Sequence, residues 1–417
     1  MSKVRKIIWH KESGIINVVF PIIILFSLYM LFQGWVPHWG AVILISLLVG
    51  VLIFAFSSKG LFQRRYFIYF LFFCVIVGIK VLIGNTYWDV GLFNLLSSGL
   101  MMALGLMVSN YYLTGINEET LGKRVITTFH FIVVLTTIAT AVLSIANPQI
   151  IRYAMEENNF FDNKVILTQL YKSGMSNYYL PHALPVIIPP FVCLAKNDKR
   201  KKSHRWGAVL IISLCLLLIY FSGAMTALLL GIVSLLGALV ITSNAKKNVV
   251  RLLLALGLLL PLILNDDLVL SGLRSIENVL GSDNYFYDKI VDFENSIKND
   301  TAEGGIETRS SLYTISLQEF IKNPVFGTEN EVGGHSVLLD FMASLGIVGF
   351  LPFLLMLFSL CVWVKRMLPA KVQPYYAYGF LIGVIMLGVK SMNNLEMWFC
   401  LFALLPILSK ESVVEYR

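Results

Sequence analysis

Long apolar runs alternate with short polar connections along almost the whole chain. Each run is rich in Leu, Ile, Val and Phe and approaches the roughly 20 residues that a helix needs to cross a bilayer. Strand-like alternation, which marks a membrane β-barrel, is absent from these runs. The pattern predicts an all-α polytopic membrane protein with about 12 transmembrane helices. The expected spans are 14–32, 41–56, 66–84, 90–109, 125–146, 180–195, 206–221, 225–242, 250–264, 336–364, 375–392 and 394–409.

Composition excludes a soluble globular protein. The chain is 57% hydrophobic and 14% charged, whereas soluble domains carry about 25% charged residues. We therefore expect one integral membrane domain over residues 1–417. The first apolar run lacks a small-residue cleavage site, which favours an uncleaved span over a removable signal peptide. The five cysteines lie within apolar runs and have no CxxC spacing, so neither a disulfide nor a zinc site is expected.

The distribution of lysine and arginine predicts the orientation of the spans. Most of the 33 cationic residues fall at the two ends of the chain and in every second connection. By the positive-inside rule these segments face the cytoplasm, with both termini there. The net charge of +8 therefore reflects topology, and an acidic outward loop is no nucleic-acid surface.

Two of the predicted outward loops are long. The first covers 147–179. The second covers 265–335, between the ninth and tenth spans, and is rich in Asp and Glu. A solvated face explains most of these carboxylates.

The end of the second loop holds the strongest candidates for chemistry. Arg309 opens a short segment that Asn323-Pro324-Val325-Phe326-Gly327 ends, and Gly333-Gly334 then leads to His335 at the mouth of an apolar run. Guanidinium binds phosphate oxygens as a two-pronged donor, and imidazole exchanges a proton with a hydroxyl near neutral pH. Each residue also has a simpler explanation, because Arg309 can contact lipid headgroups and a lone interfacial histidine is commonly structural. Together they suit a lipid-linked anionic substrate.

The segment after Arg309 has a rough apolar stripe at helical spacing. Leu312, Ile315, Phe320 and Ile321 form this stripe. We expect a short helix that lies on the membrane surface.

Other cations on the outward side are candidates for binding an anion. Lys80 and Lys390 lie near the outward ends of their spans, where ionisable groups either line a cavity or extend to the interface. A salt bridge between Lys390 and Glu396 is the simpler explanation there. Arg152 and Lys172 in the first long loop, with Arg274 in the second, are either ordinary loop cations or part of the same basic patch.

Several motifs are absent from the sequence. It contains no Walker A loop, no HExxH and no GxSxG. The adjacent pair Asp266-Asp267 is a poor metal site by itself, because hard cations need several convergent oxygens. No cofactor and no metal are expected.

The order of Arg309, the Asn323–Gly327 stretch and His335 resembles the signature of bacterial O-antigen ligases and Wzy-type polysaccharide polymerases. Members of this superfamily have about a dozen spans and a large outward loop before a late span. The resemblance implies a GT-C-like, metal-independent membrane glycosyltransferase that uses undecaprenyl-pyrophosphate-linked oligosaccharides. Carried onto this chain, Arg309 would hold the pyrophosphate and His335 would assist proton transfer.

The resemblance also implies a location and partners. The protein would lie in the bacterial cytoplasmic membrane and act with a flippase and a chain-length regulator. A polymerase of lipid-linked repeat units is the first hypothesis. A ligase that transfers finished glycan to lipid A core is the alternative within the superfamily, and a lipid-oligosaccharide transporter is the alternative outside it.

This chain departs from the family pattern at several positions. Ser336 follows the histidine, where many members have Asn, and Ser344 stands where they have Glu. Met225 lies near the expected place of an arginine between two middle spans, and Lys172-Ser173-Gly174 replaces a loop arginine before a glycine.

Overall fold

The computed structural model of the protein describes only part of the chain. The described residues are 60–84, 92–114, 119–146, 179–197, 202–241 and 305–412, with isolated positions at 45, 47–51, 274–275, 287, 290–291 and 294–295. The expected spans 14–32 and 250–264, most of 41–56, and residues 147–178 of the first long loop lie outside them.

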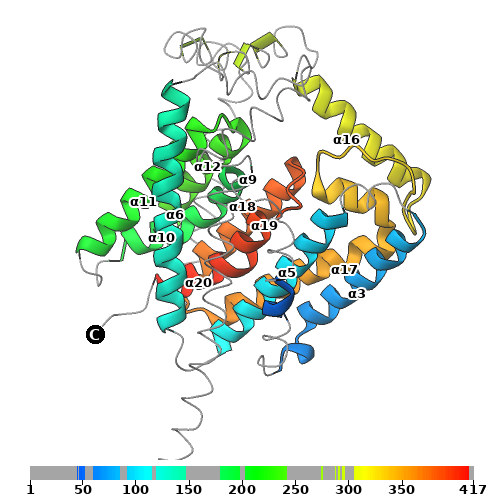
Figure 1. The fold of residues 1–417 in the computed structure, drawn as a ribbon, viewed down its shortest axis with the longest axis horizontal. Coiled ribbons are helices and arrows are strands. Elements are labelled where there is room, and N and C mark those ends of the chain that lie inside the picture. Colours follow the sequence, from blue (N-terminus) through cyan, green and yellow to red (C-terminus); the bar gives the residue numbers. More distant parts are fainter. Residues whose placement is uncertain are drawn as a thin grey trace, which may run out of the picture.

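Every regular element in the described part is helical (Figure 1). The longer helices are α3 (Arg65–Leu82), α5 (Leu92–Thr114), α6 (Glu119–Ala146), α11 (Lys202–Phe221), α12 (Met225–Val240), α16 (Gly305–Lys322), α17 (Val337–Met367) and α18 (Gln373–Val389). The shorter pieces are η1 (Leu61–Gln63), α9 (Tyr179–Ala183), η3 (Leu184–Ile187), α10 (Ile188–Ala195), α19 (Leu395–Trp398), η4 (Phe399–Leu404) and α20 (Leu405–Glu411).

Four described helices are long and apolar enough to cross a membrane. They are α3, the Arg124–Ala146 part of α6, α11 and α17. Shorter apolar helices accompany them at Tyr179–Ala195, Met225–Val240 and Gln373–Val389. The described part of the chain is therefore all-α, and its long apolar helices indicate an integral membrane protein, as the run lengths predict.

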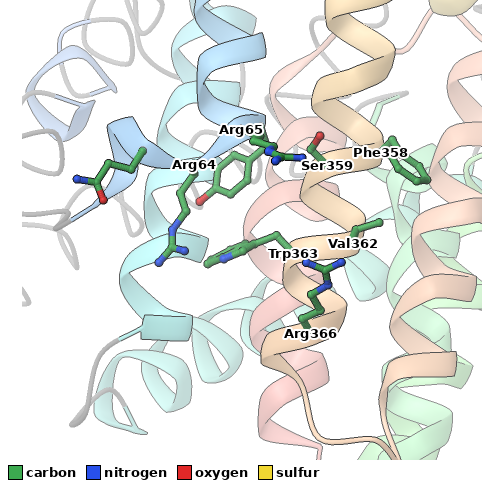
Figure 2. Close-up of a pocket in the computed structure, with 9 residues that line it drawn as sticks. Arg64, Arg65, Phe358, Ser359, Val362, Trp363 and Arg366 are labelled. Carbon is green, nitrogen blue, oxygen red and sulfur yellow. The ribbon is translucent and has the colours of Figure 1, made fainter.

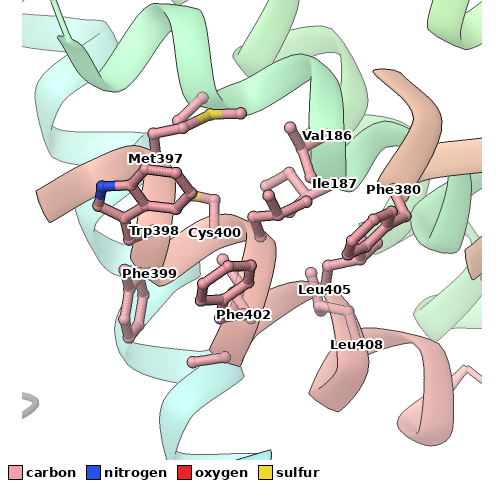
Figure 3. Packing of buried hydrophobic residues seen from close by; sticks show 14 of the residues in the cluster. Val186, Ile187, Phe380, Met397, Trp398, Phe399, Cys400, Phe402, Leu405 and Leu408 are labelled. Atoms are coloured by element: carbon pink, nitrogen blue, oxygen red, sulfur yellow. The ribbon is translucent and has the colours of Figure 1, made fainter. Parts of the chain in front are cut away.

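The late segment α19–η4–α20 is buried among the other described helices, and Figure 3 shows its side chains packed with Val186, Ile187 and Phe380. Almost every side chain from Leu395 to Leu408 is buried, including Trp398 and Phe402. It packs against α5 on one side and against η3, α10 and α18 on others. A helix that is apolar on all sides belongs in such a position, because no face of it needs water.

Small residues allow the neighbouring helices to approach this central segment. A Cβ atom added at Gly105 of α5 would lie 2.7 Å from Phe402 Cβ, and one added at Gly383 of α18 would lie 2.7 Å from Leu401 Cδ1. Gly379, four residues before Gly383, is equally tight against Val186 O. Close approach at a small-xxx-small spacing is a common way to join helices in lipid.

The pair α3 and α17 packs along most of its length. The two helices run in opposite directions, since Tyr66 contacts Trp363 with ring centroids 5.0 Å apart, while Ile76 borders Gly349. Phe73 packs against Phe353 between these two levels.

The expected span 336–364 is not one continuous helix. Gly346 has φ 59° and ψ −169°, which interrupts α17 and divides it into 337–345 and 347–367. Loop residues 324–328 fill the interruption with backbone hydrogen bonds. Ile347 N donates to Pro324 O (2.8 Å), Val348 N donates to Val325 O (3.1 Å), and Thr328 N donates to Ala343 O (2.8 Å).

This arrangement explains the apparent excess length of the run. The part 347–367 alone rises about 31 Å at 1.5 Å per residue, which matches a hydrocarbon core about 30 Å thick. The part 337–345 therefore lies beyond this length, at the end of the bundle where α16 packs against α17.

Glycine is required at the interruption. A Cβ at Gly346 would lie 2.4 Å from Val325 O, and its positive φ is unfavourable for any other residue. We expect Gly346→Ala to lower the free energy of unfolding by at least about 2 kcal/mol. Thermal unfolding of the detergent-solubilised protein measures this loss.

Gly78→Ala is the matched control, because a Cβ there meets nothing within 4 Å in the middle of α3. It should leave stability unchanged or slightly improved. Equal stability of the two variants would contradict the assigned role of Gly346.

Candidate functional site

The candidate site lies where α16, the loop 323–336 and the start of α17 meet. Figure 1 shows α16 beside one end of the α3–α17 pair. Two carboxylates, Asp340 and Glu319, organise the loop between these helices.

Asp340 joins α16, the glycine hinge and α17. It is fully buried. Ser316 Oγ donates to Asp340 Oδ1 (2.7 Å), as does Gly334 N (3.2 Å), and Ser336 N donates to Oδ2 (3.1 Å). Gly333 N in turn donates to Ser316 Oγ (3.0 Å). The carboxylate thus holds the turn that carries His335 by both of its oxygens.

Ser336 begins α17 as its N-cap. Its Oγ accepts a hydrogen bond from Leu339 N (3.2 Å). Ser and Asn both serve well at this position, so Ser336 caps the helix as an Asn would. Ser344 donates to Asp340 O in the preceding turn (2.6 Å). Two amides at the start of α17, those of Ser336 and Leu339, are therefore already bound by the protein's own side chains.

Glu319 anchors the other half of the loop. Its carboxylate accepts hydrogen bonds from Lys322 Nζ (2.6 Å), Thr328 Oγ1 (2.9 Å) and Asn330 Nδ2 (3.0 Å). These donors, Lys322 foremost, lower the pKa of Glu319 to about 2. The carboxylate remains charged at any physiological pH, and the loop is fixed by charge-assisted hydrogen bonds.

His335 is half-buried beside Tyr313 of α16, with ring centroids 6.0 Å apart. Tyr313 itself donates to Val389 O at the end of α18 (2.8 Å). His335 is therefore held between α16, α17 and the end of α18.

Lys80 and Lys390, the two lysines predicted near the ends of their spans, both lie beside the loop 323–336. Lys390 is 5% exposed, and its carbonyl accepts a hydrogen bond from Val337 N (3.3 Å), two residues after His335. Lys80 is 7% exposed at the end of α3 and interacts electrostatically with Glu329 of the loop. Glu396 is also buried, and its expected salt bridge with Lys390 stays a prediction.

The remaining candidates are placed differently. Arg309 lies within α16, one helical turn before Tyr313. Arg274 forms an ion pair with Glu294 (Nε to Oε1, 2.9 Å). Arg152 and Lys172 lie outside the described residues.

The buried face of α16 is more polar than its apolar stripe indicates. Ser316 and Glu319 are buried, whereas Ile315 and Ile321 are exposed. The reason is the hydrogen-bond network, since Ser316 and Glu319 supply the groups that hold the loop. The exposed isoleucines are free to face lipid, as a surface helix requires.

Sequence reasoning missed Asp340, Glu319 and Ser316 as the residues that shape this site. A signal for Asp340 was present, because a carboxylate four residues into an apolar run needs dedicated partners. Glu319 and Ser316 gave no such signal, since both residue types are ordinary on a surface helix.

Among the described residues, no group of three His, Cys, Asp or Glu side chains could hold a metal ion. No protein-family model and no curated protein matches the chain.

Ser316→Ala tests the Asp340 network. It removes the hydroxyl that bridges Asp340 and Gly333, so we expect a loss of about 1–3 kcal/mol in unfolding free energy. Ser213→Ala is the control, because that exposed hydroxyl donates to Val209 O within its own helix. If thermal unfolding shows equal effects for the two, Ser316 does not stabilise the loop.

Glu319 predicts a pH-dependent contribution to stability. Its pKa is lowered on folding to about 2, so its stabilisation is complete above its ordinary pKa and is lost as pH falls toward 2. The difference in thermal midpoint between wild type and Glu319→Gln should be largest at neutral pH and shrink below about pH 4.5. Glu331→Gln removes an exposed carboxylate from the same loop and is the matched control. A constant difference across this pH range would refute the prediction.

Proposed function

We propose that this protein is a membrane glycosyltransferase that polymerises lipid-linked oligosaccharide repeat units. The observation that carries the proposal is the convergence of His335, Lys80 and Lys390 around one anchored loop at the outward end of the bundle. The resemblance of the stretch from Arg309 to His335 to polysaccharide polymerases and ligases supports the same reaction class.

In the proposed reaction His335 acts as the proton acceptor. The hydroxyl oxygen of an acceptor sugar bonds to the anomeric carbon of the donor, and the bond from that carbon to the phosphate oxygen breaks. Undecaprenyl pyrophosphate leaves with the electron pair, and the hydroxyl proton passes to the imidazole. The donor bond supplies the energy, so no nucleotide is needed.

The cations stabilise the leaving group. Pyrophosphate gains negative charge as the bond breaks, and fixed positive charges close to it lower the barrier. Lys80 and Lys390 are held in place by burial, and Arg309 adds a permanent cation on α16. The amides of Ser336 and Leu339 at the start of α17 do not contribute, because the side chains of Asp340 and Ser336 already accept their hydrogen bonds.

The rest of the proposed architecture follows the sequence. About 12 spans in a GT-C-like arrangement would put this site on the outer face of a bacterial cytoplasmic membrane, with both termini in the cytoplasm. A flippase that delivers the lipid-linked units and a chain-length regulator are the proposed partners.

One structural feature favours a transporter as the second candidate. Transporters bind substrates at discontinuous helices whose unwound backbone is available to the ligand. In α17, however, loop residues 324–328 occupy the interruption with three backbone hydrogen bonds. The interruption therefore serves packing, and we rank the glycosyltransferase first.

The test is glycan profiling by gel in a strain that lacks the gene and carries each variant at matched membrane levels. Wild type should restore a ladder of long chains. His335→Ala, Arg309→Ala and Lys390→Gln should leave mostly single repeat units, with a loss of roughly 100-fold or more for the histidine. His204→Ala, on the exposed start of α11, is the matched control and should retain the ladder.

Other outcomes identify the alternatives. Long chains that accumulate on the lipid carrier when the protein is absent would indicate a ligase. Lipid-linked units that remain on the inner face would indicate a transporter. A full ladder from all three site variants would show that the chemistry lies elsewhere.

A further inference from the structure

A second basic site lies at the opposite end of the α3–α17 pair. A pocket of about 460 Å³ opens there between the start of α3 and the end of α17. Its described lining includes Arg64, Arg65 and Arg366, with Trp363, Ser359 and Gln63, and contains no carboxylate (Figure 2). Three guanidinium groups without an acidic neighbour in the lining give the pocket a strong preference for an anion.

Hydrogen-bond donors at this pocket are not fully used. Arg64 lies over the Trp363 ring, with Cζ 5.3 Å from the centroid. Arg64 Nε and Trp363 Nε1 are both buried without a hydrogen-bond partner among the described residues. Buried donors normally have partners, so an acceptor-rich group seated here would complete the arrangement.

Figure 2 shows Trp363 between the guanidinium groups of Arg64 and Arg366. The start of α3 adds to this positive field, because its first turn contains no acidic residue and no side chain caps it. Helix N-termini favour anions, phosphate groups among them.

The pocket also borders the lipid-facing surface. Phe358, in its lining, is 68% exposed. Further along the two helices Ile68, Leu71, Phe72 and Val75 of α3 and Leu351 and Leu354 of α17 are exposed. An amphiphile could thus place its charged group in the pocket and its chains on apolar helix surface. A free phosphate ion would use only the first of these features.

We propose that this pocket binds the phosphate headgroup of an anionic phospholipid from the leaflet on that side. The arginine-rich connections assign this side to the cytoplasm by the positive-inside rule, and basic pockets between spans on that side are suited to anionic headgroups. The inference is independent of the proposed glycosyl transfer, because the pocket and His335 lie at opposite ends of α17.

Native mass spectrometry of the full-length protein in detergent tests the proposal. The protein is titrated with palmitoyl-oleoyl phosphatidylglycerol, with the matching phosphatidylcholine, and with inorganic phosphate as a competitor. Wild type should retain one phosphatidylglycerol more tightly than phosphatidylcholine. Inorganic phosphate at millimolar concentration should not displace it.

Two variants locate the binding. Arg366→Gln removes an exposed guanidinium and should weaken phosphatidylglycerol binding by roughly tenfold, as expected for one charge-assisted contact. Trp363→Phe keeps an aromatic side chain and removes the indole N–H together with its five-membered ring, while all three guanidinium groups stay, so it should give a smaller loss. Lys202→Gln removes an exposed cation at the start of α11, away from the pocket, and should bind like wild type. Thermal unfolding verifies that each variant is folded.

Three results would overturn the proposal. Arg366→Gln could bind as tightly as Lys202→Gln, which would place the lipid elsewhere. Phosphatidylcholine could bind equally well, which would remove the role of net charge. Displacement by inorganic phosphate would show that the pocket takes phosphate from solution instead of a lipid.

Discussion

The end of the bundle that carries α16 and His335 depends on a short length of loop backbone that fills the gap in α17. A helix in a membrane must satisfy all its backbone groups, because lipid offers no hydrogen bonds. At Gly346 three of these groups turn to residues 324–328. The loop cannot move without exposing them, so the same contacts that permit the interruption also fix the loop. The positions of Glu319, Asp340 and His335 all follow from it.

Charge is separated along the molecule in a way that apolar packing makes possible. The α3–α17 pair joins Lys80 at one end to Arg64 and Arg366 at the other through a column of aromatic contacts, of which Phe73 with Phe353 is the middle. Charged groups at the centre of a bilayer are costly, and they gather here at the two ends. Each end of the helix pair thus has its own set of charged groups. The packed apolar length between the ends fixes the distance that separates the two sets.

Periodicity and composition predict the helical membrane fold because the length of an apolar run is a direct physical requirement of the bilayer. They also direct attention to His335 and to Lys390. These residues are close in the structure, because His335 lies two residues before Val337 and the carbonyl of Lys390 accepts a hydrogen bond from Val337 N. The interruption at Gly346 escaped prediction, since a glycine within an apolar run is ordinary and only its φ marks the break. The buried polar face of α16 was not predicted for a related reason. Hydrogen bonds to residues far along the chain determine which face of α16 is buried, and the spacing of Ile315 and Ile321 does not.

The buried segment α19–η4–α20 has a consequence for how the protein assembles. It follows in the chain every helix that it packs against, including α5, α10 and α18. During synthesis those helices enter the membrane before this segment does, so lipid first contacts Gly105 and the part of the Gly383 surface that Leu401 and Met397 later cover. The interior is completed only when the last helix displaces that lipid. The last step in forming the bundle is therefore the replacement of lipid contacts by protein contacts, after the earlier helices have been inserted.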